Sequence, residues 1–317
     1  MPELPEVETV RQGLNQVTLN QEIGGGDVLL CRSIAHPLSV SEFLAGLKNT
    51  TITGWHRRGK YLLAELTNSD SSNQEKLRTQ ESEVRREELV SQIHPWENNP
   101  KSANAGWLGV HLRMTGQLLW LNQEQPLQKH TRVRLFFPDS RELRFVDQRT
   151  FGKMWWVPAS EAPENIITGL QRLGPDPFSA DFSVEYLVRQ LKNRQRSIKT
   201  SLLDQALVAG VGNIYADEAL FLSGIRPETL CANLQIDQIS RIRTSIIQVL
   251  QASIEAGGTT FSDFLNVQGV NGNYGGVAWV YGRTGEPCRV CGTSIQRFKL
   301  AGRSSHFCPK CQLKAEV

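Results

Sequence analysis

Apolar residues follow a two-residue period in the N-terminal half of the chain and a helical period in the C-terminal half. Over residues 28–66, 106–121 and 131–157, short β-branched and apolar runs alternate with turn residues. This alternation predicts antiparallel strands, including strand, turn and strand over 51–66 and a hairpin closed at 138–140. Residues 2–14 predict a preceding helix, because Pro5 suits an early helical position and Glu6 and Glu8 suit the positive end of a helix dipole.

Beyond residue 178 the pattern turns helical. Apolar residues recur every three or four positions, which predicts helices over 183–193, 197–207, 213–224 and 235–258. Gly257 and Gly258 end the last helix. Its apolar stripe comprises Ile236, Ile239, Ile242, Ile246, Val249, Leu250 and Ile254. We therefore expect an α+β fold, in which an N-terminal helix and an antiparallel β-sandwich precede a helical domain.

Two segments interrupt these elements. Residues of about 67–105 are rich in Ser, Asn, Gln and Glu and carry seven acids against five bases. Few apolar positions recur there, so a helix over 74–93 would be marginal, and we expect a mobile polar insertion between two strands. Residues 158–177 are rich in proline and predict a linker.

Four cysteines near the C-terminus predict a metal site. Two C-x2-C pairs separated by sixteen residues are typical of structural zinc, in which four thiolates close a tetrahedral shell and leave no position for chemistry. Such a segment is too short to bury its own core, so metal binding supplies its folding free energy. The expected ligands are Cys288, Cys291, Cys308 and Cys311.

Charge narrows the class of partner. The whole chain carries a net charge of only +3, so a nucleic-acid-binding field has to be local. From residue 283 to 317, seven Lys or Arg face two Glu, which leaves +3 after four thiolates and one zinc ion, since 7 − 2 − 4 + 2 = 3. This excess of positive charge suits binding to a phosphate backbone. The alternative is a zinc site that only stabilises the fold of this segment. A second basic run, for which a solvated helix face is the alternative, contains Arg189, Lys192, Arg194, Arg196 and Lys199.

Other features indicate the compartment. Cys31 and Cys231 are isolated thiols, which fit a reducing cytosol better than a disulfide framework. No apolar run approaches eighteen residues and the first twenty positions lack a signal-peptide core, so we expect no membrane span and a cytoplasmic protein.

Two places could carry chemistry. If the initiator Met is removed, Pro2 becomes a secondary amine whose pKa of about 7.7–8 leaves a nucleophilic fraction at neutral pH. Attack on a sugar C1′ would give an iminium, with Glu3 and Glu6 as acid and base partners; a plain helix start is the alternative.

The second place is the turn at 208–213. There Gly210 and Gly212 let the backbone approach something closely. A helix starts near Asn213, so its N–H groups could hold a phosphate. A helical hairpin with glycines for packing is the alternative.

Six motifs, in order, resemble the formamidopyrimidine-DNA glycosylase family. Together with the second cysteine pair they run from residue 2 to 311 and leave out only the insertion: PELPEVE, RGKYLL, HLRMTG, DQRTFG, AGVGNIYADE and YGRTGEPCRVCG. The resemblance implies a helix-two-turns-helix motif and a C-terminal zinc-finger β-hairpin. It implies a catalytic domain over 1–157, the linker over 158–177, a helical DNA-binding domain over 178–282 with a lesion-capping loop at about 262–280, and a zinc finger over 283–317.

The resemblance also implies a mechanism. The Pro2 amine attacks C1′ of a damaged nucleotide, Glu3 protonates the sugar ring oxygen and Glu6 supports the nucleophile. β- and δ-elimination then cut the strand, so the enzyme is a glycosylase and a lyase. Lys60 and Arg303 complete the implied catalytic set through phosphate contacts.

The resemblance further implies how DNA is held. The lesion is flipped out, and Met114, Arg149 and Phe151 fill the hole. The remaining implied DNA ligands are His130, Lys199 and Asn213. This chain departs from many relatives at two positions, since Thr150 stands where they have an arginine and Ser262 where they often have a lysine.

The implied partner is duplex DNA that contains oxidised purines or abasic sites, bound by a monomer that holds one structural zinc ion. An endonuclease VIII-type enzyme for oxidised pyrimidines is the nearest alternative, and Met114, Arg149 and Phe151 argue against it. A non-catalytic zinc-dependent DNA-binding protein would be favoured if Met1 were retained. A zinc-ribbon transcription factor would leave the N-terminal PELPEVE motif without a reason.

Overall fold

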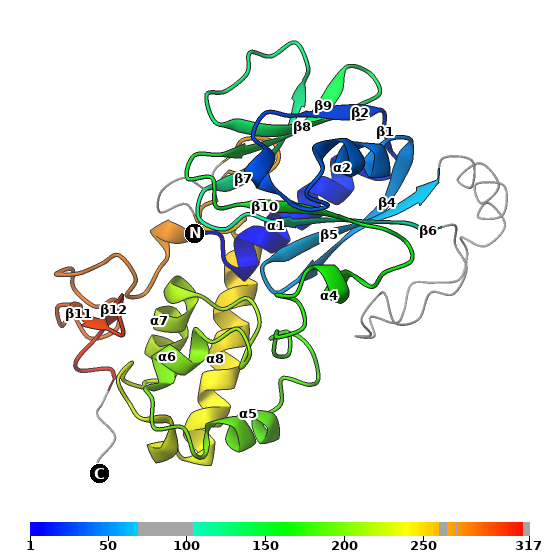
Figure 1. The fold of residues 1–317 in the computed structure, drawn as a ribbon. Coiled ribbons are helices and arrows are strands. Elements are labelled where there is room, and N and C mark those ends of the chain that lie inside the picture. The colour runs from blue at the N-terminus through cyan, green and yellow to red at the C-terminus, as the bar shows by residue number, and fades with distance from the viewer. Residues whose placement is uncertain (69–103, 260–264, 271, 313–317) are drawn as a thin grey trace, which may run out of the picture. The chain divides into compact units, whose positions relative to one another are not determined.

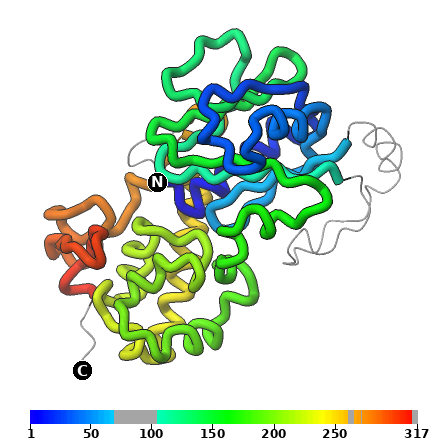
Figure 2. The backbone as a smooth tube through the Cα atoms, in the orientation of Figure 1, coloured from blue at the N-terminus to red at the C-terminus, as the bar shows by residue number. Residues whose placement is uncertain are grey.

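A computed structural model describes residues 1–68, 104–259, 265–270 and 272–312. The chain divides into two compact units (Figures 1 and 2). The first unit comprises Met1–Pro2, Val7–Gln171 and Ser262–Asn271, and the second comprises Glu3–Glu6, Arg172–Phe261 and Gly272–Val317. Within the described residues, no helix combines the length and apolarity needed to cross a bilayer.

The first unit contains two sheets, which confirms the strand-rich N-terminal half. The six-stranded sheet has the order β1 (Glu22–Ile23), β4 (Thr50–Arg58), β5 (Tyr61–Asn68), β6 (Asn104–His111), β10 (Lys153–Val157) and β3 (Ile34–His36). The four-stranded sheet has the order β2 (Gly25–Val28), β8 (Thr131–Phe137), β9 (Arg141–Asp147) and β7 (Gly116–Asn122). The β4–β5 and β8–β9 hairpins are those expected from the alternation. Among the described strands all pairs are antiparallel except β10–β3, which is parallel and was not anticipated.

Alternation along the strands builds the core of this unit. Every second residue of β8 is buried, so one face of the strand turns inward. Helix α1 (Leu4–Thr18) adds Val7, Val10 and Leu14 to the same cluster. Helix α2 (Val40–Leu47) begins at Ser39, whose hydroxyl accepts from the Glu42 N–H, and is preceded by the short helix η1 (Cys31–Ser33).

Three boundaries differ from the sequence expectation. Helix α1 begins at Leu4, so Pro2 and Glu3 precede it. The ends of the expected insertion are strand: Thr67 of β5 pairs with Asn104 of β6. The rest of the insertion, including the helix considered over 74–93, lies outside the described residues. One helical turn, α4 (Pro163–Ile166), lies in the expected linker.

The second unit is helical and ends in a hairpin, as expected. It contains α5 (Val184–Leu191), α6 (Ile198–Leu202), α7 (Asn213–Leu222), η2 (Cys231–Asn233), α8 (Ile236–Glu255), η3 (Tyr274–Gly276), β11 (Gln296–Leu300) and β12 (Arg303–Phe307). Helix α8, yellow in Figure 1, packs against α5 and α7. The expected stripe is buried on α8 except at its two ends: Ile254 is half-buried, and Ile236 is 67% exposed because it lies in the first turn, before the helix reaches its packed face. Gly257 and Gly258, both at positive φ, follow the helix end.

Candidate functional site

The first turn of α1 lies against the loop that precedes α7. The Leu4 N–H donates to the Gly210 carbonyl over 3.1 Å. A methyl group at Gly210, where φ is +90°, would lie 2.7 Å from Cβ of Leu4, and one at Gly212 would lie 2.3 Å from Cδ of Glu3. The glycines therefore permit the close approach that the sequence predicted, and what they approach is the chain's own N-terminal segment.

The N-terminus of α7 holds an anion, but the anion is a side chain of this protein. Oε1 of Glu3 accepts from the Ile214 N–H at 3.0 Å, and Oε2 accepts from the Tyr215 N–H at 3.4 Å. Glu3 is buried. The expectation that these N–H groups bind a phosphate is wrong, because the Glu3 carboxylate already uses the positive end of the helix.

A second carboxylate is buried one turn along α1. Oε2 of Glu6 accepts from the Glu3 N–H at 2.8 Å, while Oε1 accepts from the Thr259 N–H at 2.8 Å and the Tyr215 hydroxyl at 2.6 Å. Burial raises the pKa of Glu6, against the lowering effect of these hydrogen bonds. A carboxylate with a raised pKa is a competent proton acceptor at neutral pH. Its partner Glu3 is the residue after Pro2, so two buried carboxylates stand at the start of the chain.

Lys199 does not lie on a solvated face. It is 1% exposed, and its ammonium lies 2.7 Å from Oδ1 of Asp217 and donates to the Ser304 carbonyl at 2.5 Å. Burial lowers the pKa of Lys199, and Asp217 opposes that effect. The structure therefore contradicts the expectation of a DNA-contacting Lys199, since its charge is used inside the second unit.

The remaining basic run is also partly neutralised. Nη1 of Arg194 lies 3.4 Å and Nη2 of Arg196 lies 2.5 Å from the same carboxylate oxygen of Asp204. Sequence reasoning treated this run as a patch because no acid occurs within it, but the fold supplies acids from the segments that follow.

The buried cluster around Asp217 fixes strand β12. Oδ2 of Asp217 accepts from the His306 N–H at 2.9 Å, and the Asn213 amide donates to the Ser304 carbonyl at 3.1 Å. Arg303 begins this strand and is exposed. Contacts at Ser304 and His306 thus position the backbone that carries the Arg303 guanidinium.

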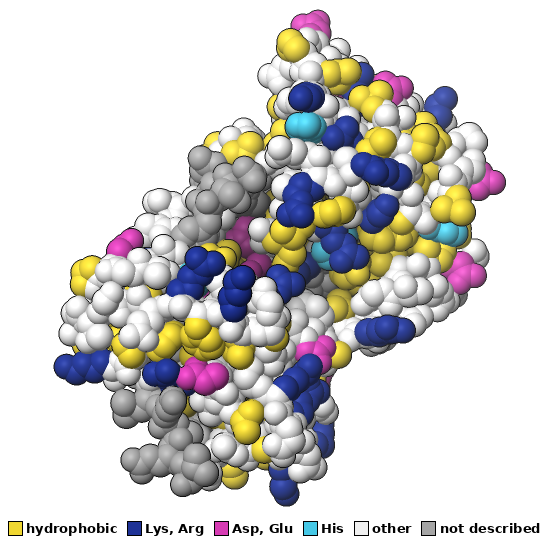
Figure 3. All heavy atoms as spheres, turned by 60° about the vertical axis from the view of Figure 1, so that its left-hand side comes forward, with side chains coloured by type: hydrophobic (Ala, Val, Ile, Leu, Met, Phe, Trp, Pro, Cys, Tyr) yellow, Lys and Arg dark blue, Asp and Glu magenta, His cyan; other side chains and the backbone are white. Residues whose placement is uncertain are grey.

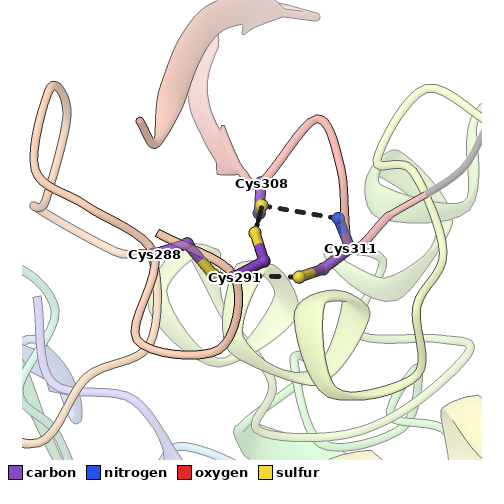
Figure 4. Close-up of side chains that lie close together, drawn as sticks. All are labelled: Cys288, Cys291, Cys308 and Cys311. Carbon is purple, nitrogen blue, oxygen red and sulfur yellow. Dashed lines mark hydrogen bonds between the residues drawn. The ribbon is translucent and has the colours of Figure 1, made fainter. Parts of the chain in front are cut away.

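The four predicted zinc ligands converge at the base of the hairpin (Figure 4). Their sulfur atoms all lie within 4.8 Å of one another. Zn–S bonds of about 2.3 Å in a tetrahedron place neighbouring sulfurs about 3.8 Å apart, and the Sγ atoms of Cys288 and Cys311 are 3.8 Å apart. The N–H groups of Val290 and Cys311 approach thiolate positions. The four cysteines therefore suit one structural zinc ion, as predicted.

In the first unit, one buried carboxylate shapes the loop that follows β9. Oδ1 of Asp147 accepts from the Thr115 hydroxyl at 2.5 Å, and Oδ2 accepts from the Gly152 N–H at 2.7 Å. The Thr115 hydroxyl also accepts from the Arg149 N–H at 3.0 Å. Sequence reasoning did not single out Asp147, although it opens the DQRTFG motif and its position at a strand end, five residues before a glycine, was a usable signal.

This loop presents an exposed aromatic ring. Phe151 is 51% exposed, and the Arg149 guanidinium lies 5.0 Å from its ring centre. Met114, which is half-buried, adjoins Thr115 and hence the same loop. The structure thus brings together two of the three residues expected to fill a DNA vacancy and connects the third to them. A ring backed by a cation suits stacking on bases.

Lys60 lies in the β4–β5 turn, and the histidine near it is His111 rather than His130. Burial, Arg113 and Lys60 lower the pKa of His111 to about 3. Its Nδ1 accepts from the Arg113 N–H at 3.0 Å, so the neutral ring carries its proton on Nε2. Sequence reasoning missed His111, which the HLRMTG motif contains.

His130, the expected ligand, lies elsewhere in the first unit. It is half-buried, with its ring 3.1 Å from the Arg132 guanidinium. Its carbonyl accepts from the Asp147 N–H at 2.9 Å.

The expected capping loop at 262–280 is described only in part, and Ser262 lies outside the described residues. Val267 is buried in the first unit, where its carbonyl accepts from the Trp120 N–H and its side chain fills the space above Gly13. In the second unit, buried Glu218 on α7 accepts from three successive N–H groups at 2.7–2.9 Å, those of Trp279, Val280 and Tyr281. One carboxylate therefore anchors the C-terminal end of this segment.

On the surface drawn in Figure 3, Lys and Arg side chains are more frequent than Asp and Glu side chains. A positive field of this kind suits a polyanion.

Three descriptions of known protein families match successive parts of this chain. The description "Formamidopyrimidine-DNA glycosylase N-terminal domain" matches residues 1–154, "Formamidopyrimidine-DNA glycosylase H2TH domain" matches 173–264, and "Zinc finger found in FPG and IleRS" matches 285–313.

Similar proteins include the formamidopyrimidine-DNA glycosylases of Nostoc punctiforme, 65% identical over 98% of this chain and 96% of the relative, and of Acaryochloris marina, 60% identical over 98% and 99%.

Solved structures of the same family also resemble this chain. A Lactococcus lactis FPG mutant in complex with Fapy-dG-containing DNA matches with a TM-score of 0.81 and 32% identity over 99% of this chain and all of that chain. MutM in complex with DNA containing carbocyclic 8-oxo-G matches with a TM-score of 0.80 at the same identity and coverage.

Proposed function

Since the chain belongs to the formamidopyrimidine-DNA glycosylase family and is a base-excision-repair DNA glycosylase, we propose that it excises oxidised purines from duplex DNA through the amine of Pro2. Solved relatives hold DNA with Fapy-dG or 8-oxo-G lesions, or with abasic sites. The observation that carries the proposal is the pair of buried carboxylates, Glu3 and Glu6, beside Pro2.

The first chemical step forms a bond from the Pro2 nitrogen to C1′ and breaks the glycosidic C–N bond, so that the base leaves with the electron pair and takes up a proton. Glu6 accepts the proton that the amine loses. Burial raises the pKa of Glu6, so its carboxylate readily takes up this proton.

Glu3, after its carboxylate has taken up a proton from water, donates that proton to the sugar ring oxygen, and the C1′–O4′ bond opens to an iminium. The Ile214 and Tyr215 N–H groups stabilise the carboxylate that remains. Loss of a C2′ proton with cleavage of the C3′–O bond is β-elimination, and loss of a C4′ proton with cleavage of the C5′–O bond is δ-elimination. Water finally hydrolyses the iminium and regenerates Pro2.

DNA contacts come from both units in this proposal. Phe151 and Arg149 enter the stack with Met114 and occupy the place of the flipped nucleotide. Lys60, Arg303 and the neutral Nε2–H of His111 bind phosphates. Two further contacts that the family resemblance implies, Asn213 and the ring of His130, are retained in the proposal. We assign Lys199 to the positioning of β12 instead.

Borohydride trapping tests the proposal. A duplex with 8-oxoguanine opposite cytosine is incubated with the zinc-loaded protein, and the reduced adduct is mapped by mass spectrometry. We expect one adduct at Pro2 and a strand cut on both sides of the site. A protein whose chain starts at Pro2 but that forms no adduct would contradict the mechanism.

The same assay tests the alternative that the enzyme prefers oxidised pyrimidines to oxidised purines. One relative of known structure holds DNA with an oxidised pyrimidine, so a duplex with an oxidised pyrimidine is run in parallel. Faster excision of that lesion than of 8-oxoguanine would favour the endonuclease VIII-type reading.

Oligomeric state and compartment complete the proposal. We place the enzyme in the cytoplasm, because its zinc thiolates and two further thiols suit a reducing compartment. We also propose that it acts as a monomer. Light scattering of the free protein and of its DNA complex would measure the stoichiometry.

A further inference from the structure

Thr150 adopts a conformation that its side chain disfavours. Its φ is +59°, in the left-handed region, where a β-branched residue is a rare outlier. Such conformations persist when neighbouring groups hold them, and they cluster at functional sites. Thr150 stands between Arg149 and Phe151, so whatever holds it also sets the loop that presents the exposed ring.

The group that holds Thr150 is Arg32, from a segment more than a hundred residues earlier. Nη2 of Arg32 donates to Oγ1 of Thr150. The Lys153 ammonium in turn donates to the Arg32 carbonyl. The parallel pairing of β3 with β10, with Ile34 opposite Met154, places the two segments side by side. Arg32 is thus fastened to the middle of the 148–152 loop and to the first residue of the strand that follows it.

The surroundings of Arg32 are cationic. Arg32 and Arg149 are exposed, and neither they nor Lys153 makes an ion pair within the part of the chain that the structure describes. The acid of the loop, Asp147, is fully buried and uses its two oxygens on Thr115 and Gly152. A guanidinium has five N–H donors, and one bond to Thr150 leaves others facing solvent.

We propose that Arg32 is a DNA-phosphate ligand that also fixes the conformation of the 148–152 loop. The inference rests on the proposed function, because it assumes that this loop enters DNA. The family resemblance implies an arginine at position 150, which is Thr150 here, and Arg32 brings a guanidinium to that position from the helix η1. The ligand chemistry is a phosphodiester, and the outward N–H groups of the guanidinium match it bidentately.

The test compares matched arginine variants of the full zinc-loaded chain. Binding to a duplex with a stable abasic analogue is measured over a salt series for wild type, Arg32→Gln and Arg241→Gln. Arg241 is an exposed arginine already paired with Asp237 on α8. The logarithm of the binding constant falls as the logarithm of the salt concentration rises, and loss of one phosphate contact makes this slope less steep by about 0.9. We expect that change for Arg32→Gln and none for Arg241→Gln.

Two further variants separate the roles of Arg32. Thr150→Val keeps the shape but removes the acceptor, so it should slow excision while leaving the salt slope unchanged. Arg32→Gln combined with Thr150→Arg should recover the slope, and failure to recover it would overturn the claim that the two positions share one site. An unchanged slope in Arg32→Gln would overturn the phosphate contact itself. Failure of wild type to bind the duplex would instead count against the proposed function.

Discussion

Single buried carboxylates connect distant segments of this protein. Glu3, Glu6, Asp147 and Glu218 each accept two or more hydrogen bonds, most of them from backbone N–H groups. Taking a carboxylate out of water is costly, and these donors offset the cost. Removal of one charge therefore leaves N–H groups without an acceptor, so the effects on folding and chemistry have to be measured separately.

Glu3→Gln separates the two effects. The amide that replaces one oxygen cannot accept, so the N–H of Ile214 or of Tyr215 meets another donor. We expect a loss of about 1–3 kcal/mol in the free energy of unfolding together with loss of base excision, since the proton donor is gone. Urea denaturation and excision of 8-oxoguanine measure these. Glu22→Gln on the exposed edge strand is the control, and full excision by Glu3→Gln would remove Glu3 from the mechanism.

His111 predicts a pH dependence of stability. Its pKa is about 3 in the folded chain and about 6.5 when unfolded, so below pH 6.5 the unfolded state binds a proton that the folded state does not. The unfolding free energy should therefore fall as pH falls from 6.5 towards 3, by up to about 1.4 kcal/mol per unit from this group. Denaturation at pH 7.5, 6.0 and 5.0 measures the slope. His111→Asn should flatten it, and an equal slope in both proteins would contradict the assignment.

Sequence reasoning singled out residues that a motif or a spacing marks, and missed residues whose surroundings only the fold brings together. Pro2, Glu3 and the four cysteines follow from motif and spacing. Lys199 was misassigned because its partner, Asp217, lies on the next long helix, and no local pattern shows that the two meet. His111 and Asp147 were passed over because a lone histidine or aspartate at a strand end carries no periodic signal.

At the scale of elements, the loop before α7 has to accommodate Glu3 and Leu4, which lie against its glycines. Its conformation also depends on Gln205, whose amide donates to the Val211 carbonyl and accepts from the Gly210 N–H. These bonds explain why α6 ends at Leu202 rather than near residue 207 as expected. The helix types followed from periodicity, but this end depended on a side chain beyond the helix.

Gly212→Ala tests that fit. Its methyl group would lie 2.3 Å from Cδ of Glu3, so the carboxylate has to move off the α7 N-terminus. We expect a loss of about 1–3 kcal/mol from overpacking and a larger fractional loss of excision than of DNA affinity. Gly276→Ala is the control, because nothing lies within 4 Å of its added methyl group. Equal excision by the two variants would show that the Glu3 position is not critical.

Removal of the zinc ion tests the hairpin. Cys308→Ser leaves three thiolates, so β11 and β12 should lose their fold and Arg303 its position. We expect one equivalent of zinc to be lost and affinity for damaged and undamaged duplexes to fall together. Cys31→Ser, at an exposed thiol outside the cluster, is the control. Affinity unchanged after zinc loss would separate the hairpin from DNA binding.

At the scale of the whole molecule, the insertion interrupts the chain without separating its strands. Thr67 and Asn104 are direct partners across β5 and β6. Replacement of residues 69–103 by a short Gly-containing turn should therefore close an ordinary hairpin. We expect the unfolding free energy to change by less than about 1 kcal/mol and excision to persist. A folded deletion variant that no longer excises would assign the segment a role in the reaction.

The order of the units along the chain was only partly predictable. The change from strand to helical periodicity located the transition near the proline-rich segment. It did not reveal that residues 3–6 pack with the second unit or that residues 265–270 pack with the first. Both exchanges depend on contacts between residues far apart in sequence, such as Leu4 with Gly210 and Val267 with Trp120.

This exchange of segments means that no single cut yields two self-sufficient fragments. Residues 172–317 expressed alone would lack the carboxylates that satisfy the N–H groups of Ile214 and Thr259. Residues 1–171 alone would lack Val267, which fills the space above Gly13. The two halves cannot be recombined between relatives as independent modules, so a chimera has to exchange the N-terminal turn and residues 265–270 along with the unit in which each of them packs.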